Sequence, residues 1–90
     1  MSSEDSIVLT YFQLQQLLRV EADPKSSLYV LKKMYEAASA AVSFAVSEAK
    51  KSPKDTNKAS AVTTARQKFA AAEKEYVAMW RKLAAQMNNP

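Results

Sequence analysis

The side chains available for catalysis are carboxylates and hydroxyls, because the 90-residue chain contains neither histidine nor cysteine. Glu73 and Glu75 are two positions apart, so on a helix they point in different directions and cannot act on one substrate. A serine row occurs at helical spacing, at Ser39, Ser43 and Ser47, but no histidine is present to activate a hydroxyl. We therefore predict that the protein is not an enzyme and has no catalytic, metal-ligating or cofactor-binding residues.

Glycine is also absent from the sequence. Its absence excludes glycine-rich phosphate loops and most two-residue β-hairpin turns. A chain rich in alanine and lysine, interrupted by three prolines, is typical of long helices. Ninety residues suffice for one domain with a modest core, and no disulfide can add stability. The composition predicts one all-α domain over residues 1–90.

Prolines and capping residues divide the sequence into three segments. Asp23 followed by Pro24 fits an N-cap with proline at the first helical position. The segment from Ser52 to Asp55 repeats this pattern around Pro53, with Asp55 placed near the start of the next helix. The predicted helices span about 5–21, 25–50 and 55–87.

The second and third predicted helices each carry a row of apolar residues at alternating steps of three and four, the a/d pattern of a heptad repeat. We call these rows the seams. The seam of the second helix is Leu28, Leu31, Tyr35, Ala38, Val42, Ala45 and Ala49. The seam of the third is Val62, Ala65, Phe69, Ala72, Tyr76, Met79 and Leu83. Two matched seams joined by a short turn predict an antiparallel helical hairpin.

Apolar residues outside the seams predict an interaction surface. Val30, Ala37 and Phe44 form a second stripe, and the first helix is apolar on nearly every side. Such a helix is normally buried all round, whereas a 90-residue three-helix bundle buries one broad face of it and rarely the whole circumference. The excess implies a protein partner, either another copy in a homo-oligomer or a different helical protein. The predicted partner interface comprises Tyr11, Leu14, Leu18, Val30, Phe44, Val77, Trp80 and Met87.

Two points stay open in the sequence. Trp80 fits two roles equally well, as an anchor for a partner or as a cover of the core against the first helix. Residues 6–12 are β-branched and aromatic enough to form a strand in place of a helix. The first helix either packs on its own hairpin, which gives a three-helix bundle, or packs against a partner chain as part of an oligomeric bundle.

Four lysines cluster at the turn of the hairpin: Lys50, Lys51, Lys54 and Lys58, which we call the basic tip. One interpretation is a binding site for phosphate, as in a nucleic-acid-associated regulator. The other is charge that complements a helix C-terminus and solvates an exposed turn. The second is favoured, because the cluster lacks the arginines and interleaved aromatics typical of nucleic-acid sites.

Charge is split along the chain. Residues 1–23 carry four acids against Arg19, a net −3, whereas the remainder carries twelve basic against five acidic residues, a net +7. The acidic start is unlike a signal peptide, and no apolar run reaches the roughly 20 residues of a transmembrane segment. A helix at residues 7–20 that inserts into a membrane surface is disfavoured, because its polar residues are glutamines where basic ones are expected. These features predict a cytoplasmic protein.

The pattern as a whole favours a non-enzymatic interaction or assembly protein: a small adaptor, chaperone or filament-type subunit. Over residues 25–87 its general form resembles the needle subunits and small co-chaperones of bacterial type III secretion, which are short helical hairpins with a proline-containing turn. The turn here has Pro53 but lacks the second proline of the needle turn. The resemblance implies a component or client of a secretion or assembly system.

Overall fold

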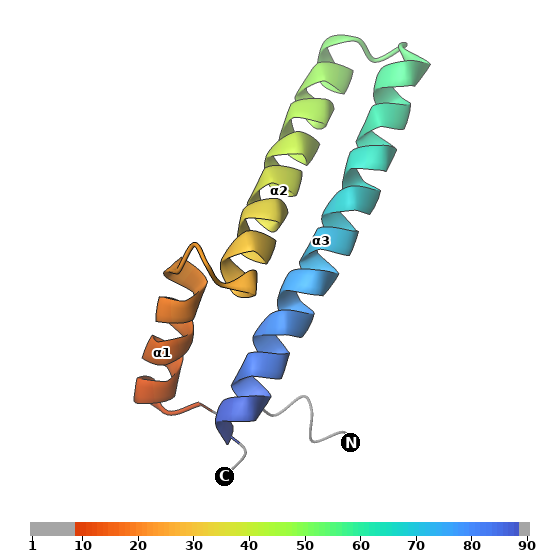
Figure 1. Cartoon of the computed structure of the whole chain (residues 1–90). Helices are drawn as coiled ribbons and strands as arrows, with labels where there is room; N and C mark the ends of the chain where they lie inside the picture. The colour runs from red at the N-terminus through yellow and green to blue at the C-terminus, as the bar shows by residue number, and fades with distance from the viewer. Residues whose placement is uncertain (1–8, 89–90) are drawn as a thin grey trace, which may run out of the picture.

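The computed structural model describes residues 9–88, which contain three helices and no strand. The helices are α1 (Tyr11–Ala22), α2 (Ser27–Lys51) and α3 (Thr56–Asn88). Helices α2 and α3 run antiparallel, side by side, and α1 lies near the C-terminal end of α3 (Figure 1). The predicted all-α class and the hairpin are confirmed, and the ends of α2 and α3 fall within two residues of their predicted positions.

The molecule is long and thin, at 57 × 35 × 18 Å. Helix α3 is the longest element, with α2 beside its first part and α1 beside its end (Figure 1). The side-chain amide of Gln13 donates to the backbone carbonyl of Met87 at 2.9 Å, which joins the start of α1 to the end of α3. A helix with its side chains is about 10–12 Å across, so 18 Å is less than two helices thick. Every helix therefore keeps an outward face.

The seam between α2 and α3 is confirmed. Every residue of both predicted rows is buried or half-buried. Near the middle, the Tyr35 ring of α2 lies 5.3 Å from the Phe69 ring and 5.4 Å from the Tyr76 ring, measured between centroids. Such aromatic pairs add about 0.5–1.5 kcal/mol each beyond the area they bury. Alanines at several seam positions occupy little space between the two helices.

Helix α1 begins at Tyr11, so the prediction of a helix from about residue 5 is wrong at Leu9 and Thr10. The Thr10 hydroxyl accepts the backbone N–H of Gln13 at 3.1 Å, and the Gln13 side chain accepts the backbone N–H of Thr10 at 2.9 Å. This reciprocal capping box fixes the first turn of the helix. Of residues 6–12, left open between helix and strand, 11 and 12 are helical and 6–8 lie outside the described residues.

Helix α2 begins later than predicted because Ser26, and not Asp23, is its N-cap. The Ser26 hydroxyl accepts the backbone N–H of Tyr29 at 3.0 Å and donates to the carbonyl of Val20 at 2.5 Å. One side chain thus links the end of α1 to the start of α2. Asp23 is the C-cap of α1, and Pro24 lies in the turn instead of at the first helical position.

The hairpin turn is short and is held by Asp55. The Asp55 carboxylate accepts the backbone N–H groups of Asn57 at 2.9 Å and Lys58 at 3.3 Å. The backbone N–H of Asp55 donates to the carbonyl of Ser52 at 3.0 Å, where α2 has just ended. Asp55 therefore caps α3, in agreement with its predicted place at the helix start.

Replacing Asp55 with alanine is expected to lower the free energy of unfolding by about 1 kcal/mol, because two N–H groups at the start of α3 lose their acceptor. Urea denaturation followed by circular dichroism measures this loss. The matched control is Lys54→Ala, an exposed residue in the same turn, for which a change within about 0.5 kcal/mol is expected. Equal losses in the two variants would contradict the capping role.

Candidate interaction surface

Few apolar side chains are covered by the protein's own core. Within the described residues, the hydrophobic residues that are buried are Leu17, Leu28 and Ala84. The large hydrophobic residues that are exposed are Tyr11, Phe12, Leu14, Leu18, Val30, Met34, Phe44 and Val77. Single exposed apolar residues are common on soluble proteins, so the arrangement of this set decides its meaning.

Most of the predicted interface residues are exposed, but two are not. Trp80 and Met87 are half-buried at the end of α3, where α1 packs. For Trp80 this position fits the role of covering the core against the first helix. The prediction also omits Phe12 and Met34, which are 67% and 52% exposed.

Helix α2 carries a second heptad row outside its contact with α3. The row is Val30, Met34, Ala37, Ala41 and Phe44, separated by steps of four, three, four and three, and all five residues are exposed. We call it the second seam. At 3.6 residues per turn it lies roughly 100° around the helix from the seam that contacts α3. It extends the predicted stripe of Val30, Ala37 and Phe44 by the residues that lie between them.

An open groove continues the second seam onto α3. One part of this groove is lined by Met34, Ala38, Lys68, Ala71, Ala72 and Glu75. The adjoining part is lined by Ala37, Ala38, Ala41, Asn57, Ser60, Ala61, Thr64, Ala65 and Lys68. The two parts share Ala38 and Lys68, so they form one surface along the hairpin. Its lining is rich in alanine and carries Lys68 and Glu75, one charge of each sign.

Helix α1 leaves this surface uncovered, because it lies beside the end of α3 and contacts α2 near the start of that helix, away from the second seam (Figure 1). Lys32 of α2 lies roughly 160° around the helix from the middle of the second seam. The Lys32 ammonium is 2.9 Å from the Glu21 carboxylate of α1. The helix that was expected to provide cover therefore contacts α2 away from the second seam, near the start of α2. It also keeps Tyr11, Leu14 and Leu18 of its own exposed.

A buried carboxylate holds α1 in this position. Glu21, only 8% exposed, accepts the Tyr76 hydroxyl at 2.5 Å and the Lys32 ammonium at 2.9 Å, so one side chain binds both other helices. The pKa of Glu21 is below its ordinary value. Burial alone would raise this pKa, but hydrogen bonds from Tyr76 and Lys32, with a smaller contribution from Trp80, outweigh burial and lower it. Burial and the hydrogen bond to Glu21 raise the pKa of Tyr76 to about 12.

The stability of the protein is expected to depend on pH through this cluster. The pKa of Glu21 is lowered in the folded protein. Ionised Glu21 therefore adds its full contribution to the free energy of unfolding above pH 4.5, the ordinary pKa, and this contribution is lost as pH falls through the folded-state pKa. The pKa of Tyr76 is raised in the folded protein. Protonated Tyr76 therefore adds its full contribution to the free energy of unfolding below pH 10.0, and this contribution is lost as pH rises through about 12.

Urea unfolding across the acidic range tests the first part of this prediction. We expect Glu21→Gln to flatten the acidic loss of stability, whereas Glu73→Gln, at an exposed carboxylate of α3, serves as the control and leaves the profile close to wild type. An unchanged acidic profile in Glu21→Gln would contradict the role assigned to Glu21.

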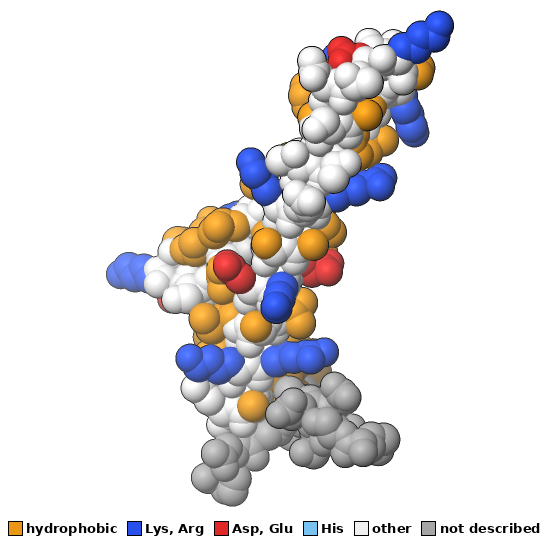
Figure 2. All heavy atoms as spheres, turned by 90° about the vertical axis from the view of Figure 1, so that its right-hand side faces the viewer, with side chains coloured by type: hydrophobic (Ala, Val, Ile, Leu, Met, Phe, Trp, Pro, Cys, Tyr) orange, Lys and Arg blue, Asp and Glu red, His pale blue; other side chains and the backbone are white. Residues whose placement is uncertain are grey.

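The basic tip is less open than the sequence suggests. Lys51 pairs with Glu48 at 3.3 Å, and the Lys58 ammonium lies 3.4 Å from the Ser52 hydroxyl. Lys50 and Lys54 are exposed. On the face seen in Figure 2, lysine and arginine side chains are spread along the length of the molecule and are not concentrated at the turn.

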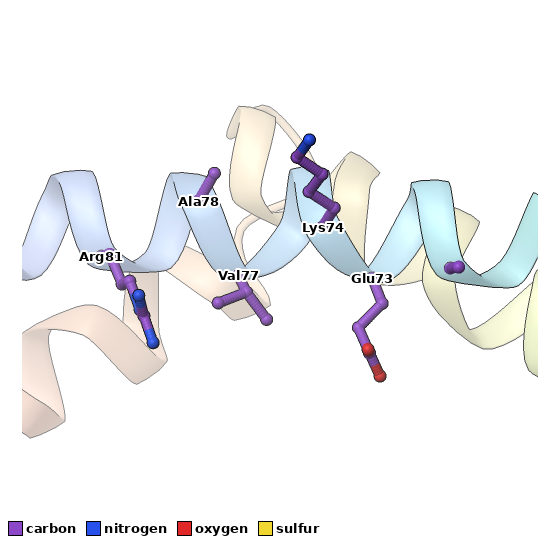
Figure 3. Close-up of a pocket in the computed structure, with 6 residues that line it drawn as sticks. Glu73, Lys74, Val77, Ala78 and Arg81 are labelled. Atoms are coloured by element: carbon purple, nitrogen blue, oxygen red, sulfur yellow. The ribbon is translucent and has the colours of Figure 1, made fainter. Parts of the chain in front are cut away.

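A shallow depression on α3 adds little to the surface. Its lining residues, Ala70, Glu73, Lys74, Val77, Ala78 and Arg81, all belong to this one helix. Glu73, Val77 and Arg81 point to one side of α3, away from Lys74 and Ala78 (Figure 3). The exposed Val77 is thus flanked by one acidic and one basic side chain, and the depression lies outside the groove beside the second seam.

Three further findings bear on function. Within residues 9–88, acidic side chains do not gather into a group able to hold a metal ion. None of the described helices combines the length and apolarity needed to cross a bilayer. No protein-family model, curated protein or solved structure matches the chain. We therefore infer function from the surface of the molecule alone.

Proposed function

We propose that this protein is a non-enzymatic helical interaction protein, which completes its hydrophobic core with another chain. Roles of this kind include a small adaptor, a chaperone or a filament-type subunit, in the cytoplasm and as a component or client of a secretion or assembly system. The observation that carries the proposal is the second seam. It is a heptad row of apolar residues along α2 that no helix of the described chain covers.

The size of the exposed apolar surface supports this function. Val30, Met34 and Phe44 are 49%, 52% and 69% exposed. Complete burial of such a side chain contributes about 1.5–3 kcal/mol, so covering the exposed parts of these three would contribute on the order of 3–5 kcal/mol before the cost of association. That is a large share of the roughly 5–15 kcal/mol that stabilises a small protein. Contiguous apolar surface of this kind marks interaction sites.

The alternative function is that of a nucleic-acid-associated regulator that binds through the basic tip. It has less support, because Lys51 pairs with Glu48 of α2 and the Lys58 ammonium lies beside the Ser52 hydroxyl. The double variant Lys50→Glu/Lys54→Glu tests it. Loss of salt-dependent binding to a DNA duplex in this variant would favour the alternative.

The experiment for the main proposal measures the mass of the purified chain by light scattering over a range of concentrations. Helicity and the binding of a hydrophobic dye are recorded in parallel. A mass that rises with concentration, or a poorly helical monomer that binds the dye, is the expected result. A fully helical monomer at every concentration that does not bind the dye would overturn the proposal.

A further inference from the structure

We propose that the partner at the second seam is a second copy of this chain, packed antiparallel about a twofold axis beside Ala37. The inference rests on the proposed function and specifies the partner and its orientation. The face involved is the second seam with the adjoining groove on α3. Three properties of this face, namely its shape, its charge and its area, fit a second copy.

The second seam is complementary to itself when reversed. With the axis beside Ala37, Phe44 of one copy comes opposite Val30 of the other. Met34 then meets the small residues at Ala40 and Ala41. A large side chain thus faces a medium or small one along the row, as knobs-into-holes packing requires. Ala37 faces its own copy on the axis, where two helices can approach most closely.

Charge favours the antiparallel orientation over the parallel one. In this arrangement the end of α2, which carries Lys51 and Glu48, comes close to the turn before α2 of the other copy, where the exposed Asp23 and Lys25 can pair with them. Each pair occurs twice by symmetry. In a parallel dimer, the Lys51 side chains of the two copies would lie close together at one end and repel. Exposed ion pairs contribute only about 0–1 kcal/mol each, so these charges select the orientation more than they set affinity.

The area of the face also fits a dimer. Helix α2 has 25 residues, so the face is about 37 Å long at 1.5 Å per residue. Two packed helices with axes 8–10 Å apart make it about 18 Å wide. The face offers on the order of 700 Å² per copy, close to the roughly 800 Å² that each partner contributes to a standard specific interface.

A pair of neighbouring substitutions tests the surface. Phe44→Glu is expected to raise the dimer dissociation constant by about 100-fold, because it replaces the largest apolar side chain of the second seam with a charge at two symmetry-related points of the contact. Ser43→Glu adds a similar side chain at the adjacent exposed position, off the second seam, and is expected to change the constant by less than about threefold. Sedimentation equilibrium measures both. Circular dichroism checks folding, which Phe44→Glu is expected to preserve because the residue is 69% exposed.

Single cysteines test the orientation, since the chain has none of its own. Across an antiparallel interface, Ala37→Cys is expected to form a disulfide with its own copy under mild oxidation. Val30→Cys alone should form little, whereas a mixture of Val30→Cys and Phe44→Cys should form the mixed disulfide. A disulfide requires Cα atoms within about 7 Å. Equally efficient self-linking of Val30→Cys would indicate a parallel dimer and overturn the proposal.

Other outcomes separate this inference from the proposed function. A dimer that Phe44→Glu does not weaken would overturn the second seam as the contact and leave an interaction protein in place. A dye-binding wild-type monomer would likewise overturn self-association and indicate a partner of another sequence. A fully helical monomer without dye binding would overturn both.

Discussion

Replacing Leu17 with alanine is expected to release α1 from the hairpin. Leu17 is 0% exposed, and the loss of a buried leucine side chain costs about 2–5 kcal/mol. Helix α1 has only 12 residues, and an isolated helix of that length is marginal in water. Its helicity therefore depends on packing. We expect faster hydrogen exchange throughout α1, while the amides in the middle of α2 and α3 stay protected by their own seam.

The matched control for this prediction is the next residue. Leu18→Ala removes the same atoms from a side chain that is 43% exposed, so its effect on stability is expected to be below about 1 kcal/mol. Trp80 gives a second signal, because it lies near Glu21 and its fluorescence should shift to the red only when α1 leaves. Similar exchange rates in the two variants would show that Leu17 does not hold α1.

Replacing Tyr76 with phenylalanine is expected to lower the free energy of unfolding by about 1.5–3 kcal/mol. The substitution keeps the ring in its stack with Tyr35 and removes one hydroxyl, which donates to the Glu21 carboxylate. Hydrogen bonds to charged groups contribute more than neutral ones, and Glu21 is buried, so the carboxylate loses a donor that water replaces poorly. Lys32 remains bound to the same carboxylate.

Tyr35→Phe is the control, because it removes a hydroxyl from the other ring of the same stack. A smaller loss is expected, and the acidic dependence of stability should remain that of wild type. In Tyr76→Phe the acidic dependence should weaken, because the pKa of Glu21 moves back toward its ordinary value when the hydrogen bond is gone. An equal loss in the two variants, with unchanged pH profiles, would contradict the assigned contact.

The hairpin could be predicted from the sequence because its determinants are local or periodic. The seams repeat every three or four residues, and the capping residue Asp55 lies within three positions of both N–H groups that it accepts. The spacing of apolar residues and the hydrogen bonds between near neighbours can both be inferred from the order of residues in the sequence. The same reasoning identifies most of the exposed apolar residues, including Val30 and Phe44 on the second seam.

The contacts of α1 could not be predicted in the same way. Glu21 and Tyr76 are 55 positions apart, and nothing in either neighbourhood specifies the other. Glu21 in the sequence is one acid among nine. The starts of α1 and α2 were missed for a different reason: several residues in each region are suitable caps. Thr10 prevails through its reciprocal bond with Gln13, and Ser26 through its additional bond to Val20.

The second seam shows how a correct pattern can be left incomplete. Val30, Ala37 and Phe44 are seven residues apart and occupy one apolar position of each heptad. A heptad has a second apolar position, which Met34 and Ala41 occupy. With them, the stripe becomes a row broad enough to pack against a helix. Without them, it has the form of three isolated exposed residues.

The bond between Gln13 and Met87 also determines when α1 can dock during synthesis. A ribosome makes α1 before α3, so the groups on α3 that bind α1, the Tyr76 hydroxyl and the Met87 carbonyl, become available later than α1 itself. The contacts that α1 makes with Ser26 and Lys32 can form earlier. Helix α1 can therefore complete its native contacts only after the end of α3 has been synthesised.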